Sequence, residues 1–428
     1  MSIFEDVSKK VNEVFDEKML DNLARKTGAL KRKRIITPKR LLETMLFLRL
    51  KNPSHSLDDL VLEFKEQCCT VSKTALHNKL QKSINFFHAV LADIFAHVFT
   101  NMSVFKMINF VRSVKVIDSS DISLSKKLKK EFPGKRNQGA SVKMQVLMDV
   151  LTTQVLSFSL HKSTEPDQGY KSHIEQIKDS DLLITDLGYF CIDTFKSIMN
   201  QGGYFLSRLF KNAKIYDDDS LNEINLRAML VKSRKTKLDI NIKLGQLKLP
   251  CRLVALKLDE ESYQKRLKVL IDKRRKDPRL KENISDVLNG WSIFITNLPI
   301  SVTAHNLLIL YSVRWQIELL FKSVKTFLNM RKIEKSNPNI VKILLYTSMI
   351  AVALLGMIIL TIKDEEISFY KACKIFVKNI HKFIEYLNTK TICPILWMGG
   401  LIAQFALKET RAKRPSTKKL LGLRLFNP

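Results

Sequence analysis

Apolar and polar positions follow a helical spacing in the first quarter of the chain. Over residues 1–105 apolar side chains recur every three to four positions and glycine is almost absent, which predicts a set of α-helices. Thr37, Ser56 and Ser72 each stand where a helix should begin, because a short hydroxyl side chain caps the free N–H groups of a first turn. The last of these helices is expected to cover residues 72–87.

The two helices that follow Ser56 are compatible with a helix-turn-helix that reads DNA. A short break at residues 67–70 separates them. The second helix is expected to present polar and basic side chains outward: Lys73, Thr74, His77, Asn78, Lys79 and Lys82. Short paired helices also occur in plain helical bundles, so both interpretations stay open.

Apolar runs typical of β-strands begin after this helical region, and two of them end in aspartate. The run 110–117 precedes Asp118, and the run 182–185 precedes Asp186. A strand that ends in aspartate presents its carboxylate at the edge of a sheet, where α/β sites form. Asp121 is a second candidate, but we prefer Asp118 because it follows the apolar run directly. Either aspartate is otherwise an ordinary turn residue.

The rest of the chain alternates strands and helices and then becomes helical. Residues 238–244 alternate apolar and polar side chains with period two, which predicts a half-buried strand. Further strands are predicted at 141–151, 154–161, 247–258 and from Trp291, with helices at 192–200, 265–279 and through 336–428. The chain ends in a basic tail that contains Lys408, Arg411, Lys413, Arg414, Lys418, Lys419 and Arg424.

Residues 311–325 predict a single helix with one charged face and one apolar face. At 3.6 residues per turn, one arc gathers a tyrosine, a carboxylate and three cations: Tyr311, Arg314, Glu318, Lys322 and Lys325. The simplest interpretation is a solvated face with ion pairs between residues four apart. The alternative is that the lone carboxylate ligates a metal ion beside bound phosphates.

The charge of the chain indicates its partners. Lys+Arg 72 against Asp+Glu 42 leaves a net charge of +30, and the pI is near 9.8. Such an excess favours a polyanion such as nucleic acid, with an anionic membrane surface as the alternative.

Three features bear on where the protein works. Residues 343–362 carry no charge and are long enough to span a bilayer, but they stand alone in a basic chain, so we expect a buried core helix. The six cysteines show no C-x-x-C spacing, which indicates free thiols in a reducing compartment. The first residues contain acids and lack an apolar signal core.

The spacing Tyr-x2-Arg-x3-Glu-x6-Lys of Tyr311, Arg314, Glu318 and Lys325 resembles the signature of bacterial transposases of the insertion-sequence-four type. These are DDE enzymes with a ribonuclease-H-like core. The resemblance implies that Asp118, Asp186 and Glu318 are the catalytic and metal-binding residues. They would hold two Mg²⁺ ions, for which Mn²⁺ can substitute. The DNA-binding residues would be Tyr311, Arg314, Lys322, Lys325 and Trp291.

The resemblance also implies an α/β architecture in which a β-rich insertion interrupts the ribonuclease-H-like core. Helical regions would flank this core on both sides. The expected segments are a DNA-binding region at 1–105, core halves at 106–203 and 291–335, the insertion at 204–290, and a helical region at 336–428.

The function implied by the resemblance is DNA transposition. The enzyme would bind the terminal inverted repeats of its insertion sequence, cleave the ends and join them to target DNA. Its partner would be double-stranded DNA, on which it would act as a homodimer, in the bacterial cytoplasm at the nucleoid and without stable membrane association. The rivals are a metal-dependent nuclease on the same fold and a catalytically silent DNA-binding protein, against which the acidic triad argues.

Trp291 begins a strand 20 residues before Tyr311. Core packing is the simpler role for a tryptophan at a strand start. In relatives that release ends through a DNA hairpin, a tryptophan at nearly this separation stacks on an extruded base, although the separation here is one residue short. Trp315 is a second candidate for such a role.

Overall fold

The computed structural model describes residues 2–67, 69–101, 110–135, 139–276, 283–362 and 366–408. Helices and strands alternate along the sequence, so the fold class is mixed α/β, as the sequence predicts. The described residues form two compact units, each of which combines segments that are far apart in the sequence. The first draws on Met1–Phe105, Asp118–Glu165 and Trp315–Lys418, and the second on Lys106–Ile117 and Pro166–Arg314.

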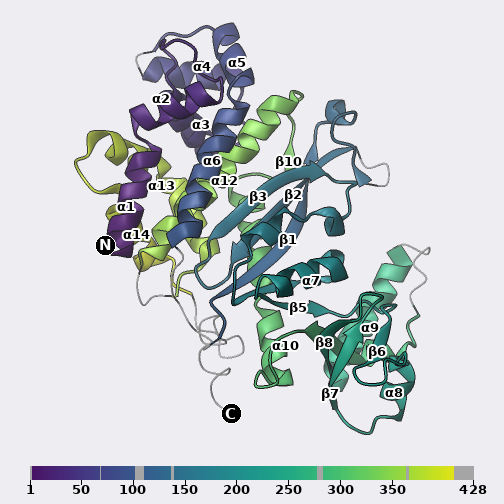
Figure 1. Ribbon diagram of the computed structural model, residues 1–428. Coiled ribbons are helices and arrows are strands. Elements are labelled where there is room, and N and C mark those ends of the chain that lie inside the picture. Colours follow the sequence, from purple (N-terminus) through teal and green to yellow (C-terminus); the bar gives the residue numbers. More distant parts are fainter. Residues whose placement is uncertain are drawn as a thin grey trace. The chain divides into compact units, whose positions relative to one another are not determined.

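The first unit is mostly helical and also contains a β-hairpin (Figure 1). Its helices are α1 (Ile3–Val14), α2 (Glu17–Lys26), α3 (Pro38–Lys51), α4 (Leu57–Glu66), α5 (Lys73–Gln81), α6 (Ile84–Asn101), α11 (Trp315–Phe327), α12 (Pro338–Leu360), α13 (Phe369–Thr389) and α14 (Pro394–Phe405). Its strands are β2 (Ala140–Asp149), β3 (Val155–Lys162), β10 (Lys332–Ile333) and the second half of β1 (Ser113–Leu124). The basic tail predicted from Arg411 onward lies outside the described residues.

Helix α12 forms the core of the first unit. Helices α3, α6, α13 and α14 and strand β3 pack against it. It is the one helix in the described ranges that is long and apolar enough to cross a membrane, and 89% of its most apolar window is buried inside the protein. The prediction that residues 343–362 form a core helix is therefore confirmed.

The helices α3 and α4 begin at the predicted capping residues. Thr37 Oγ1 accepts a hydrogen bond from the N–H of Arg40 (3.2 Å). Ser56 and Asp59 form a capping box, in which each side chain accepts from the other residue's backbone N–H. These oxygens satisfy N–H groups that have no partner within the first turn, which is why the sequence identifies the helix starts.

The helix predicted over 72–87 is wrong in its extent, because α5 ends and α6 begins within it. At the break, the Ser83 hydroxyl donates to the carbonyl oxygen of Lys79 (2.7 Å), a local bond that competes with helix continuation. Lys79 is also less exposed than expected, since it is half-buried and its ammonium group donates to the carbonyl oxygen of Ala29 (2.9 Å).

The second unit is built on one sheet with the strand order β1-β4-β5-β9-β8-β7-β6. Strands β1, β4 and β5 are parallel, and each later neighbour is antiparallel. The strands are β4 (Asp181–Thr185), β5 (Tyr204–Arg208), β6 (Ile215–Asp217), β7 (Lys237–Leu244), β8 (Leu249–Lys257) and β9 (Trp291–Thr296). The helices are α7 (Ile192–Asn200), α8 (Leu226–Lys232), α9 (Glu260–Lys276) and α10 (Ala304–Ser312).

A buried ion-pair network holds the parallel strands β1 and β4 in register. Ser113 of β1 lies opposite Asp181 of β4, and Asp181 is fully buried. Its carboxylate accepts hydrogen bonds from the Lys115 ammonium (2.5 Å), the Arg112 guanidinium (2.7 Å) and the N–H of Lys178 (2.8 Å). These donors match the lone pairs of the buried carboxylate, so the charge stays inside the unit without being left unpaired.

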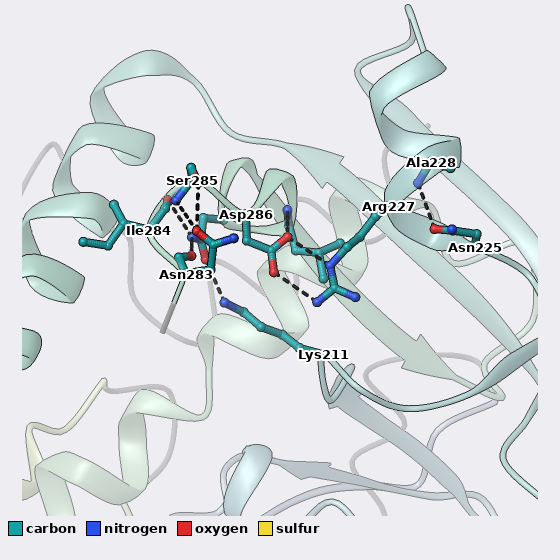
Figure 2. A network of polar contacts seen from close by, with 10 residues as sticks. Lys211, Asn225, Arg227, Ala228, Asn283, Ile284, Ser285 and Asp286 are labelled. Carbon is teal, nitrogen blue, oxygen red and sulfur yellow. Dashed lines mark hydrogen bonds and ion pairs between the residues drawn. The ribbon is translucent and has the colours of Figure 1, made fainter. Parts of the chain in front are cut away.

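A second polar network joins the segments between β5 and β9 (Figure 2). The Arg227 guanidinium of α8 donates to both carboxylate oxygens of Asp286 (3.3 and 3.1 Å). The Asp286 carboxylate also caps the short helix Val287–Gly290 by accepting the N–H of Leu288 (3.0 Å). Nearby, the Lys211 ammonium donates to Asn289 Oδ1 (2.9 Å). The polar residues thus connect three segments that are far apart in the sequence.

Strand β1 is longer than predicted. The sequence places the strand end at Asp118, whereas β1 continues to Leu124. The extension is stabilised by β10, where Ser123 lies opposite Lys332 and donates its N–H to the carbonyl oxygen of Arg331 (3.2 Å). The partner strand comes from a distant part of the sequence, so a local pattern could not indicate this extension.

The single helix predicted over 311–325 is wrong. Helix α10 ends at Ser312, α11 begins at Trp315, and the residues between them form a turn. The N–H groups of Val313 and Arg314 bond to carbonyl groups three residues back, and the Ser312 hydroxyl donates to the carbonyl oxygen of Ile309 (2.6 Å). These tighter bonds end the α-helical ladder although the sequence contains neither glycine nor proline at this point.

We predict that Asp181→Leu lowers the free energy of unfolding by about 3–5 kcal/mol, because it removes the carboxylate that pairs with the buried Lys115 charge. Urea denaturation followed by circular dichroism measures the change. The double variant Lys115→Met/Asp181→Leu should recover most of the loss. A loss below about 1 kcal/mol for the single variant, as for exposed pairs, would contradict the prediction.

Candidate active site

Asp118 and Asp121 both lie in β1 but differ in their surroundings. Asp118 is half-buried, and the N–H of Ser119 donates to its Oδ1 (2.7 Å). Because side chains alternate along a strand, Asp121 points to the opposite face of β1. Asp121 is exposed and pairs with the Lys135 ammonium (2.9 Å). The preference for Asp118 over Asp121 as the metal ligand stays a prediction.

Helix α11 keeps part of the predicted charged face. Glu318 lies in its first turn, and Lys322 and Lys325 follow at helical spacing on the same side. Lys322 is exposed, with its ammonium 5.5 Å from the centre of the Tyr370 ring. Burial lowers the pKa of Lys325, and the nearby Asp121 carboxylate opposes that shift. The face therefore combines one carboxylate with two cations in different environments.

Asp186 directly follows the last residue of β4, as predicted. Its Oδ1 accepts the N–H of Gly188 (2.8 Å), which fixes the turn Leu187–Tyr189. A Cβ atom at position 188 would lie 3.1 Å from Asp186 Oδ1 and 3.3 Å from Asp167 Oδ2. Glycine therefore lets two carboxylates approach the same turn. Asp167 lies in no recognisable motif, so it could not be identified from the sequence alone.

Tyr311 is the centre of a cluster in the second unit. Its ring packs on Phe294 of β9 with centroids 5.0 Å apart, and the Arg208 guanidinium lies 5.8 Å from the ring centre. Burial raises the pKa of Tyr311, the cations Arg208 and Arg314 lower it, and the Asp186 carboxylate raises it. Tyr311 is therefore linked electrostatically to the carboxylate of Asp186 within this unit.

Arg208 is a neighbour of Tyr311 that the sequence analysis missed. It ends β5, the parallel neighbour of β4, which leads into Asp186. The one feature of the sequence that could have pointed to Arg208 is that a cation ends the short strand 204–208. It becomes meaningful only once β5 is known to pair with β4.

The two candidate tryptophans differ in exposure. Trp291 starts β9 and is 4% exposed, so it packs within the protein. The Arg266 guanidinium of α9 donates to the carbonyl oxygen of Trp291 (2.6 Å), which further fixes this residue. Trp315, in the first turn of α11, is 52% exposed. The packing role therefore suits Trp291, and an accessible aromatic surface is present on Trp315.

The three predicted metal ligands are divided between the units. Asp118 and Glu318 belong to the first and Asp186 to the second. Within the described ranges, no three His, Cys, Asp or Glu side chains are gathered as ligands of one ion. The chemistry of the three side chains nevertheless fits a hard divalent cation, because Mg²⁺ and Mn²⁺ prefer carboxylate oxygens.

A comparison with protein families matches residues 109–354 to the family described as Transposase DDE domain. The matched segment covers more than half of the chain and includes Asp118, Asp186 and Glu318. It also includes Tyr311, Arg314 and Lys325.

Similar proteins span almost the whole chain. The transposase for insertion sequence element IS231E of Bacillus thuringiensis subsp. finitimus is 24% identical over 94% of this chain and 92% of its own length. The transposase for insertion sequence element IS1151 of Clostridium perfringens is 28% identical over 86% of this chain and 84% of its own. A solved piggyBac transposase synaptic complex with hairpin DNA shows 10% identity and a TM-score of 0.46, covering 96% of this chain and 86% of its own, which is too low to establish a shared fold.

We predict that Tyr311 titrates above the ordinary tyrosine pKa, because burial disfavours the charged phenolate. Arg208→Ala should raise this pKa further by removing a cation that stabilises the phenolate, whereas Asp186→Asn should lower it by removing a repelling anion. An ultraviolet difference titration against Tyr311→Phe isolates the signal. A lowered tyrosine pKa in Arg208→Ala, or a raised one in Asp186→Asn, would show that the cluster is not arranged as described.

Proposed function

This chain belongs to the Transposase DDE domain family, and we propose that it is a transposase of the insertion-sequence-four type. It is a DNA transposase, an enzyme that binds DNA, cleaves it and joins the cut ends. We further propose that it recognises the terminal inverted repeats of its own element and works in the bacterial cytoplasm. The proposed fold is a ribonuclease-H-like core at 106–203 and 291–335, interrupted by the insertion at 204–290.

The observation that carries the proposal is the parallel register of β1 and β4. Val116 lies opposite Ile184 in that register. Asp118 follows Val116 by two residues, and Asp186 follows Ile184 by two residues. Each of these neighbouring strands therefore leads into an aspartate, and the family match over residues 109–354 includes both, so we propose both as metal ligands. Glu318 would complete the set from α11.

The proposed roles follow from the chemistry of each side chain. Asp118, Asp186 and Glu318 would hold two Mg²⁺ ions through carboxylate oxygens. When bound, such a pair of ions activates an oxygen nucleophile and stabilises the leaving oxygen of a phosphodiester. The cations would bind substrate phosphates, Arg314 in a bidentate way and Lys325 and Lys322 as point charges.

Two further side chains would position the substrate strand near the cut. Tyr311 would contact a phosphate or sugar there. Arg208 would support this contact, since its guanidinium lies over the Tyr311 ring. The positive charge of Arg208 would also strengthen the binding of a phosphate at this position.

We propose that end recognition uses the pair α4 and α5, within the DNA-binding region 1–105. The outward side of α5 carries exposed polar residues, among them Thr74 and Asn78, that are suited to base edges. Deletion of this region is a poor test, because α3 and α6 pack against α12 in the same unit. We also propose a homodimer on DNA, which analytical ultracentrifugation of the complex would reveal as two chains per pair of ends.

We predict that Glu318→Gln binds an element end with near wild-type affinity but does not nick it in Mg²⁺. The amide keeps the shape of the side chain and removes its negative charge. Asp118→Asn and Asp186→Asn should behave in the same way, whereas Asp121→Asn should still cut. Gel-shift and strand-resolved cleavage assays on the same duplex measure both properties. Cleavage at the wild-type rate by Glu318→Gln would exclude the triad.

A matched control variant should keep cleavage and lose recognition of the element end. Asn78→Ala leaves all three carboxylates in place, so it should lose selectivity for the element end over unrelated DNA and still cut at high protein concentration. The loss expected for one base contact is about 1–3 kcal/mol. Undiminished selectivity would place recognition outside α5.

We predict different outcomes for the two tryptophans. Trp291→Ala should cost about 3–5 kcal/mol of stability, as expected for a buried large side chain. Trp315→Ala should fold normally but fail to stack an unpaired base, an interaction worth about 1–3 kcal/mol. A fluorescent base analogue beside the cut reports the stacking. If Trp291→Ala folds and alone abolishes the signal, the stacking role belongs to Trp291 and its side chain must leave its packed position.

A further inference from the structure

A concave surface lies at the C-terminal end of β1, entirely within the first unit. Its volume is about 650 Å³, and we call it the β1 groove. The end of β1, the short helix Lys126–Leu128, the start of β2 and the residues around β10 form its walls. Four lysines line it: Lys126, Lys127, Lys135 and Lys332.

The groove carries excess positive charge. Its two acids are already paired, Asp121 with Lys135 (2.9 Å) and Glu334 with Lys332 (2.7 Å). Lys126 and Lys127 are exposed, and in the described part of the chain neither forms an ion pair. Serine hydroxyls on the same walls add neutral donors: Ser123, Ser125 and Ser336. Two unpaired ammonium groups beside hydroxyl donors form a surface suited to phosphate oxygens.

The shape and exposure of the groove favour an extended polyanion over a small anion. A site for one free phosphate holds it with buried or converging donors, whereas these lysines are exposed and spread over an open surface. Such an arrangement is typical of contacts to the backbone of nucleic acid, whose charges are repeated along its length.

The groove lies beyond Asp118 along β1, and the lining residues Asp121 and Ser123 point to the face of the strand opposite Asp118. A strand advances about 3.3 Å per residue, so Asp121 and Ser123 lie about 10 and 17 Å beyond Asp118. Duplex DNA advances about 3.4 Å per base pair, so this interval corresponds to about three to five base pairs.

We propose that the β1 groove binds the sugar–phosphate backbone of duplex DNA about three to five nucleotides from the cleaved bond. Lys126 and Lys127 make the contacts, and Lys135 and Lys332 can join them by exchanging a carboxylate partner for a phosphate. The inference rests on the proposed function, since it takes Asp118 as the position of the cut. It assigns a DNA-contacting surface outside the signature residues.

The chain contains its own matched control. Lys129 and Lys130 follow Lys126 and Lys127 by three residues and are also exposed, but they do not line the groove. The variants Lys126→Ala/Lys127→Ala and Lys129→Ala/Lys130→Ala therefore remove the same charge from the same segment. General electrostatic attraction predicts equal effects, whereas the groove predicts a defect in the first variant only.

The experiment measures the affinity of the full chain for an element-end duplex between 50 and 200 mM salt. Loss of two phosphate contacts should reduce the slope of log K against log salt by about 1.8. The affinity of the wild type should therefore fall over this salt range by a factor about 12 times larger than the affinity of the first variant. The control variant should keep the wild-type slope. Ethylation interference should lose its signal about three to five nucleotides from the cut in the first variant alone.

Equal slopes for the two double variants would overturn the groove proposal. A second outcome would also overturn it. If millimolar inorganic phosphate abolishes the difference in slope between the two double variants, the lysines bind a small anion. Cleavage of the same duplex by the wild-type chain in Mg²⁺ is scored separately. If the wild type cleaves and the slopes are equal, only the groove proposal fails. If the wild type does not cleave, the proposed function itself fails.

Discussion

The buried pair between Lys115 and Asp181 is the constraint on which the candidate site depends. A fully buried carboxylate is tolerated only when donors surround it, and here an ammonium, a guanidinium and a backbone N–H do so. A shift of β1 by one residue would turn Lys115 to the other face and leave both charges unpaired. The pair therefore selects one register of β1 against β4, the strand that leads into Asp186.

The break between α10 and α11 changes how the signature residues work together. On one continuous helix, Tyr311 and Glu318 would be fixed to a common face by helical geometry alone. With a turn between them, Tyr311 is instead held by Phe294 and Arg208, and Glu318 by the packing of α11. The signature thus consists of two separately supported parts, and the turn with Arg314 connects them.

Features that depend on neighbouring residues were predictable from the sequence, and features that depend on distant partners were not. The caps at Thr37 and Ser56 and the apolar core helix α12 follow from local spacing, and the structure has them as predicted. The extension of β1 requires β10, and the role of Arg208 requires the pairing of β5 with β4. The end of α10 depends on bonds to carbonyl groups three residues back, which no residue preference in that stretch predicted.

The large positive charge of the chain serves two physically different purposes. Lys115 and Arg252 are buried and paired with carboxylates, so their charges are neutralised inside the fold and orient its strands. Lys126 and Lys127 are exposed, and their charges remain available to a polyanion. Composition alone counts these residues equally. An exposed cation gains from a phosphate because it displaces only water and counterions, whereas a buried one would first have to lose its partner. Under the groove proposal, exposed cations such as Lys126 and Lys127 contact DNA, whereas buried cations such as Lys115 stabilise the fold.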